Sequence, residues 1–141
     1  MRGPYRKRRV QLPPNFQNFK PSGIPRKFLK ALNLSIDEYE AIRLADYEGL
    51  EHQKAAEYMA ISRPTFTRLI DKARHKIARA IVDGMELVIE GGNVEFANRL
   101  RRCRKCGDEQ IQPISDLSDG CPECGPETME EVHKNFGDIN V

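Results

Sequence analysis

Residues 50–82, LEHQKAAEYMAISRPTFTRLIDKARHKIARAIV, read as two helices joined by a tight turn, and this pattern leaves few folds open to the chain. The first helix is predicted over residues 53–59, where Ala55 and Ala56 are small enough to let a second helix cross closely. Ser62 opens the second helix. The side chains expected in the shared core are Met59, Ile61, Phe66 and Leu69. This layout is typical of a helix-turn-helix, whose second helix enters the DNA major groove with its N-terminal residues on base edges.

The second helix has clear signals for its beginning and its end. Ser62 can cap it, and Pro64 falls in its first turn, where the missing N–H of proline does no harm. Apolar residues then recur at helical spacing up to Gly84, which is suited to end the helix. Ala60 is the weak point, because this turn position needs a left-handed backbone that costs alanine on the order of 1 kcal/mol.

The polar face of the second helix is basic and rich in hydroxyl groups. Arg63 and Arg68 are the predicted readers of base edges, since arginine can donate two hydrogen bonds to guanine. The other contacts predicted on this helix are Ser62, Thr65, Thr67, Lys72, His75 and Lys76, with the lysines on phosphates. The alternative interpretation is a solvated helix face without a ligand.

Basic charge is concentrated in two places, although the net charge is only +2. Residues 1–30 hold nine Lys and Arg and no acidic residue, and residues 61–80 hold six basic residues and one acidic residue. Two separate basic blocks suit a phosphate backbone. We therefore expect residues 1–33 to form a basic arm with a short helix over residues 26–32, or alternatively a disordered tail. The DNA contacts predicted on the arm, along phosphates or in a minor groove, are Arg6, Lys7, Arg8 and Arg9.

A helix that braces the helix-turn-helix is predicted over residues 35–47. Ser35 can cap it, and Glu38, three residues on, completes a capping box. We expect Asp37 and Glu40 on its solvent side, so this helix is not predicted to touch DNA.

A β hairpin is predicted over residues 85–100, because two short apolar runs flank the turn sequence Gly-Gly-Asn, and both pairing within the chain and pairing across a dimer stay open. The expected fold class is mainly α, with a helix-turn-helix DNA-binding domain and a small C-terminal β hairpin and zinc ribbon. The predicted segments are the basic arm at 1–33, the helix-turn-helix domain at 34–84, the linking hairpin at 85–100, the ribbon at 101–126 and an acidic tail at 127–141.

Four cysteines form two C-x-x-C pairs with fourteen residues between them. Two residues between cysteines let both sulfurs reach one ion, and four thiolates form the tetrahedral shell that zinc takes in structural sites. The predicted ligands are Cys103, Cys106, Cys121 and Cys124. Iron, as in rubredoxin-like sites, is the alternative metal, but no aromatic residue lies between the first and the last cysteine to surround it.

Composition and motifs narrow the function classes further. No apolar run reaches the ~20 residues of a membrane span, and the N-terminal segment has no signal-peptide pattern, so we expect a cytoplasmic protein without membrane contact. A reducing compartment favours metal over disulfides. A closed shell of four cysteines leaves no open position for hydrolysis, and no glycine-rich phosphate loop is recognisable, so no enzymatic activity is expected.

The segments GIPRKFLKALNLSIDEYEAIRLADYEGL, AAEYMAISRPTFTRLIDKARHKIARAIVDG and IEGGNVEF together resemble an uncharacterised family of bacterial and archaeal predicted DNA-binding proteins. The resemblance covers Arg2–Arg102, and its helix-turn-helix is similar to region four of sigma factors. It implies DNA binding through Ser62, Arg63, Thr65, Thr67 and Arg68. The chain departs from the family pattern at Ala60, where Gly is commoner, and at Glu51, where a Ser or Thr cap is commoner.

Together these features predict a sequence-specific DNA-binding transcription regulator with a structural zinc site. Its expected partner is double-stranded DNA, and a homodimer is expected if it reads paired half-sites. Two alternatives stay open: a protein-interaction module that docks on the transcription machinery, and an iron electron-transfer protein.

Overall fold

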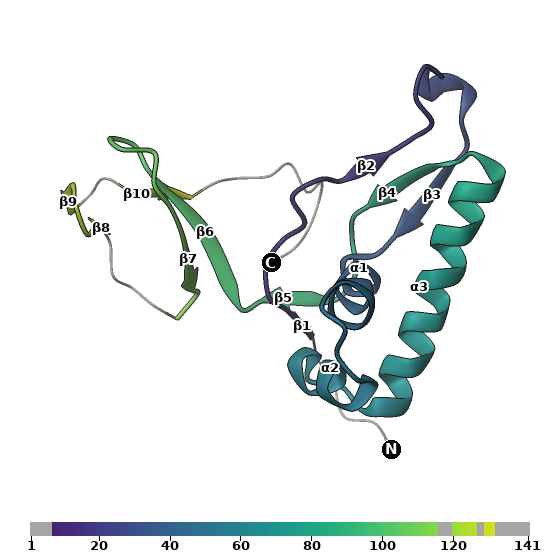
Figure 1. Ribbon diagram of the computed structural model, residues 1–141, viewed down its shortest axis with the longest axis horizontal. Coiled ribbons are helices and arrows are strands. Elements are labelled where there is room, and N and C mark those ends of the chain that lie inside the picture. The colour runs from purple at the N-terminus through teal and green to yellow at the C-terminus, as the bar shows by residue number, and fades with distance from the viewer. Residues whose placement is uncertain (1–6, 116–119, 127–128, 132–141) are drawn as a thin grey trace.

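The computed structural model describes residues 7–115, 120–126 and 129–131, which fold into three helices and several small sheets (Figure 1). The helices are α1 (Ile36–Ile42), α2 (His52–Met59) and α3 (Arg63–Asp83), with a 3-10 turn at Arg26–Phe28 and a π-helical turn at Arg43–Tyr47. The strands are β1 (Arg8–Val10), β2 (Asn18–Phe19), β3 (Ala31–Leu34), β4 (Glu86–Ile89), β5 (Val94–Phe96), β6 (Asn98–Cys103), β7 (Glu109–Pro113), β8 (Gly120–Cys121), β9 (Gly125–Pro126) and β10 (Met129–Glu131).

The prediction of a mainly α fold is therefore wrong, and the described part of the chain is mixed α and β. Short strands occur both before and after the helices, and two of the sheets have three strands. Strands of two to six residues carry little periodicity of their own, which is why the sequence pattern favoured the helices. None of the helices in the described ranges is long and apolar enough to cross a bilayer.

In the sequence, all three helices fall between β3 and β4, two strands that are neighbours in one sheet. Strand β4 pairs with β2 in the antiparallel sense and with β3 in the parallel sense, where Ala31 lies opposite Glu86 and Leu34 opposite Ile89. Parallel neighbours need a long connection, and here α1, α2 and α3 form it. The short helix predicted over residues 26–32 is wrong beyond Phe28, because the following residues form β3 instead.

The predicted hairpin over residues 85–100 is also wrong, although both of its strands exist. β4 joins the sheet with β2 and β3, whereas β5 pairs in parallel with β1. The carbonyl of Gly91 accepts a hydrogen bond of 3.0 Å from the N–H of Ile36, which holds the connection against the start of α1. At Gly92 a Cβ atom would lie 2.8 Å from Asp37 Oδ1, so glycine lets the chain pass there to the next sheet.

The predicted caps at Ser35, Ser62 and Gly84 are confirmed, whereas the helix predicted over residues 35–47 is α-helical only to Ile42 and continues as the π-helical turn. The Ser35 side chain accepts from the N–H of Glu38, and the Glu38 side chain accepts from the N–H of Ser35, which completes the capping box of α1. Ser62 caps α3, and Gly84 ends it with φ 65°. Ala60 has φ 58° and ψ 41°, and it is the one non-glycine residue with positive φ in the described part of the chain.

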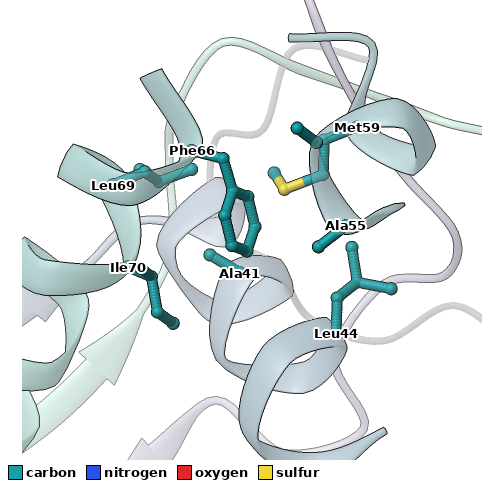
Figure 2. Close-up of a cluster of buried hydrophobic side chains, with 8 residues drawn as sticks. Ala41, Leu44, Ala55, Met59, Phe66, Leu69 and Ile70 are labelled. Atoms are coloured by element: carbon teal, nitrogen blue, oxygen red, sulfur yellow. The ribbon is translucent and has the colours of Figure 1, made fainter. Parts of the chain in front are cut away.

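Two apolar cores hold the helices and strands together. The first lies among α1, α2 and the N-terminal half of α3, with Phe66 and Met59 fully buried against Ala55 (Figure 2). The second joins Val10 of β1 to strands β3, β4 and β5 and to Ala73 in the middle of α3. The described residues of the predicted arm thus belong to the folded body.

Candidate nucleic-acid interface and metal centre

The outer face of the N-terminal half of α3 is exposed and charged. Arg63, Arg68, Lys72 and His75, all predicted DNA contacts, are exposed there. The acidic Asp71, which the sequence analysis did not single out, is exposed on the same helix. This face presents more positive than negative charge, as a surface that meets phosphate requires.

The predicted hydroxyl contacts are partly engaged within the protein. Ser62 Oγ accepts from the N–H of Thr65 at 3.3 Å and donates to Thr65 Oγ1 at 2.8 Å, so both residues stabilise the start of α3. Thr67 Oγ1 lies 3.0 Å from Nδ1 of His52, whose ring meets Phe66 edge-on at a centroid distance of 5.3 Å. Sequence reasoning missed this role of His52, which lies fifteen residues before its partner and leaves no local signature.

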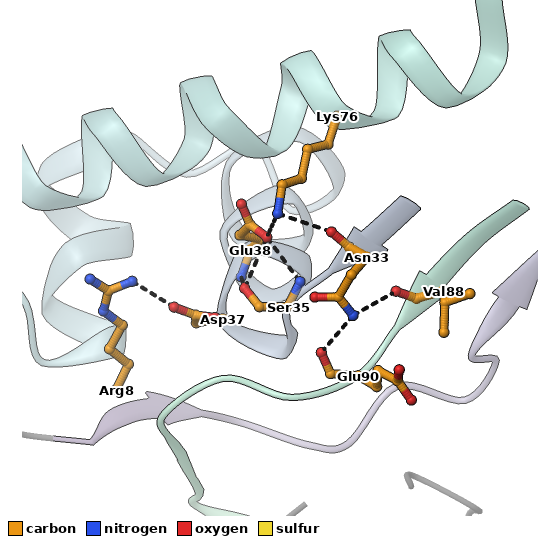
Figure 3. A network of polar contacts seen from close by, with 8 residues as sticks. All are labelled: Arg8, Asn33, Ser35, Asp37, Glu38, Lys76, Val88 and Glu90. Atoms are coloured by element: carbon orange, nitrogen blue, oxygen red, sulfur yellow. Dashed lines mark hydrogen bonds and ion pairs between the residues drawn. The ribbon is translucent and has the colours of Figure 1, made fainter. Parts of the chain in front are cut away.

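Two predicted phosphate contacts are paired with buried carboxylates of α1 (Figure 3). Arg8 Nη1 lies 2.5 Å from Asp37 Oδ2. Lys76 Nζ donates to Glu38 Oε1 at 2.7 Å and to the carbonyl of Asn33 at 2.9 Å. One oxygen of each carboxylate, Asp37 Oδ1 and Glu38 Oε2, has no hydrogen-bond partner among the described residues. These pairs fix the two cations beside the start of α1.

The expectation that Asp37 and Glu40 face solvent is wrong, since they are 7% and 0% exposed. Glu40 accepts two hydrogen bonds from Arg43, at 2.6 and 2.9 Å, and one from the N–H of Gln11 at 2.9 Å. The hydrogen bond to Glu40 raises the pKa of Arg43 against the opposing effect of burial. The signal that could have predicted this is complementary charge, because the acidic α1 region follows a segment with only basic residues.

The remaining arm contacts divide into two groups. Lys7 and Arg9 are exposed at the start of β1. Arg6 lies outside the described residues, as does most of the predicted acidic tail, of which only Met129–Glu131 is described, as strand β10.

A hollow of about 490 Å³ lies between α3, the start of α1 and β1. Its charged lining consists of Arg8, Arg68, Lys72 and Lys76 with Asp37 and Glu38. We call it the α1–α3 pocket. It brings contacts predicted on the second helix together with one predicted on the N-terminal arm.

The four cysteines converge at one point of the C-terminal ribbon. Strand β6 ends with Cys103 and strand β8 with Cys121, and the four sulfurs lie within 4.8 Å of one another. Cys106 Sγ and Cys121 Sγ are 3.7 Å apart, which fits the ~3.8 Å between sulfurs expected for tetrahedral Zn–S bonds. Strand β7 lies between the two pairs, and the cluster could hold a metal ion.

The pKa values of the Cys106 and Cys124 thiols are raised, which favours their protonated form. The pKa of Cys124 is raised to about 12, most strongly by its hydrogen bond with Cys106 and next by that with Cys103. At Cys106 hydrogen bonds with the backbone of Asp108 and with Cys124 lower the thiol pKa, but those with Cys103 and Cys121 together with burial outweigh them, so that the pKa is raised. A metal ion entering this cluster has to displace these protons.

Comparison with known proteins places the chain in a family. The family described as "Protein of unknown function DUF134" matches residues 1–97. The chain belongs to this family. The match ends in the connection between β5 and β6, so the four-cysteine ribbon lies beyond it.

Relatives occur in bacteria and archaea, and each is named "UPF0251 protein". The one from Chloroherpeton thalassium is 53% identical over 94% of this chain and 88% of its own length. The one from Halothermothrix orenii is 44% identical over 93% of this chain and 100% of its own. The one from the archaeon Methanothermobacter thermautotrophicus is 38% identical over 92% of this chain and 67% of its own. No solved structure matches the chain.

Proposed function

We propose that this protein is a sequence-specific DNA-binding transcription regulator that acts in the cytoplasm without catalysing a reaction. The observation that carries the proposal is the exposed basic face of α3, which projects Arg63 and Arg68 from a helix start that Ser62 caps and that Phe66 anchors in the core. A rigid helix with a free basic N-terminal half suits the major groove. A homodimer on paired half-sites is the stoichiometry that we propose.

We further propose that the four cysteines hold zinc. Four thiol ligands, a spacing close to that of a tetrahedral Zn–S shell and a second pair of small strands around them suit a structural zinc ribbon. Zinc would supply folding energy to the ribbon, and a colourless protein with one equivalent of zinc is the expected result of metal analysis. Visible charge-transfer absorption would instead support iron and an electron-transfer role.

The first test concerns Arg68 and uses a quantitative DNA-binding titration. We expect Arg68→Ala to weaken specific binding by about 1–3 kcal/mol and to relax the base preference at one position. The matched control is Arg79→Ala in the C-terminal half of the same helix, where Arg79 lies 3.8 Å from Asp83. Unchanged affinity and preference for the Arg68 variant would remove it from the reading residues. Absence of any DNA binding at low salt would favour a protein-interaction module.

A further inference from the structure

The α1–α3 pocket combines charged groups from three elements. It is lined by Arg8 from β1, by Arg68, Lys72 and Lys76 from α3, and by the acidic start of α1. The three α3 residues are four or eight positions apart, so they share one side of the helix. Four cations face two carboxylates, which leaves an excess of two positive charges at the pocket.

Two of the cations are held in the wall by buried acids. Asp37 binds Arg8 and Glu38 binds Lys76, while the side chains of Arg8 and Lys76 remain 30% and 23% exposed. The guanidinium of Arg8 gives one N–H to Asp37 and has further N–H groups available, since arginine has five donors. The acids thus orient these two side chains without removing them from the pocket.

The other two cations are available to a ligand. Arg68 donates to Thr65 Oγ1 at 3.5 Å, and neither Arg68 nor Lys72 forms an ion pair within the described ranges. Both are exposed. An anion at the pocket would therefore meet two free cations and two preorganised ones.

We propose that one phosphate of the DNA backbone docks in the α1–α3 pocket, where Lys72 of α3 and Arg8 of β1 contact the same phosphate. This inference rests on the proposed function and deepens it, because it couples the second helix of the helix-turn-helix to the N-terminal strand on one DNA strand. Asp37 and Glu38 then act as positioning residues for the cations.

The test is the salt dependence of binding to a mixed-sequence genomic DNA duplex. Each phosphate contact contributes about 0.9 to the slope of log affinity against log salt. Lys72→Gln removes one cation. Arg8→Gln is combined with Asp37→Asn, because Arg8→Gln alone would leave a buried charge without its partner. Lys30→Gln, on an exposed lysine just before β3, is the matched control for charge. Thermal unfolding checks that every variant is folded.

A shared phosphate predicts that the Lys72, Arg8 and Asp37 changes together lower the slope by no more than about 0.9, because only one phosphate contact is lost. The Lys30 control should keep the slope of the unmodified protein. A combined loss of about 1.8 would mean two separate phosphates and would overturn the inference, as would an unchanged slope. In both cases the unmodified protein still binds DNA, so the proposed function stands. If the unmodified protein bound no DNA at low salt, the proposed function itself would fail and the inference with it.

Discussion

Buried carboxylates are the unusual feature at the scale of single residues. Asp37, Glu38, Glu40 and Glu86 are all at most 7% exposed. Each is paired with a cation, and these partners are Arg8, Lys76, Arg43 and Arg26. Two of the four cations come from the basic N-terminal segment, so part of its charge has a structural role.

Glu40 offers the clearest test of this buried charge, because Arg43 also pairs with the exposed Glu48 at 3.3 Å. Glu40→Gln should lower the free energy of unfolding by about 3–5 kcal/mol, since it leaves a partly buried guanidinium without its main partner. Glu48→Gln should cost at most about 1 kcal/mol, because water screens an exposed pair. Chemical denaturation measures both values. Equal losses for the two variants would show that burial of Glu40 does not matter.

Ala60 stores backbone strain in the turn between α2 and α3. Its φ of 58° is unfavourable for alanine and acceptable for glycine. Ala60→Gly should therefore raise the free energy of unfolding by about 1 kcal/mol. The thermal midpoint should rise accordingly, while Ala56→Gly in the middle of α2 should lower it. A lower midpoint for the Ala60 variant would mean that its contacts outweigh its backbone strain.

At the scale of elements, α3 carries two tasks along its length. Its N-terminal half packs Phe66 and Ile70 into the helix core and exposes the basic face. Its middle packs Ala73 and Ile77 against the strands. The second task explains why α3 continues beyond the half that we propose to bind DNA.

The helices could be predicted from the sequence because their signals are local. Ser35, Ser62, Ala60 and Gly84 each act within a few residues of the helix end that they define. Strands β4 and β5 were also predicted, but their pairing was not, because β3 finds its partner β4 more than 50 residues away and has only four residues of its own. The cysteine cluster was predicted in full, since two C-x-x-C pairs restrict the geometry so strongly. The buried acids were missed because their partners lie on other elements.

The ribbon should bind zinc more tightly as the pH rises. The thiol pKa is raised at Cys106 and at Cys124, so both hold protons at neutral pH that zinc must displace. For each proton released, the affinity should rise about tenfold per pH unit below the thiol pKa. Competition with a coloured chelator at several pH values measures this slope. Affinity that did not change with pH would contradict the thiol assignment.

At the scale of the whole molecule, the four-cysteine ribbon is connected directly to the N-terminal strand β1. Figure 1 shows β6 continuing from β5, next to β1, away from the helices. The N–H of Ala97 donates to the carbonyl of Val10 at 2.8 Å, and the N–H of Asn98 to that of Gln11 at 3.1 Å. These hydrogen bonds tie the start of β6, the strand that ends with Cys103, to the end of β1.

Selection of bound duplexes from a pool of random-sequence DNA tests the central proposal most directly. The full chain, loaded with zinc, should enrich one sequence motif with guanines at the positions that Arg63 and Arg68 read, and Arg63→Ala with Arg68→Ala should abolish the enrichment while the protein stays folded. A pool that shows no enriched motif with the unmodified protein would contradict sequence-specific DNA binding.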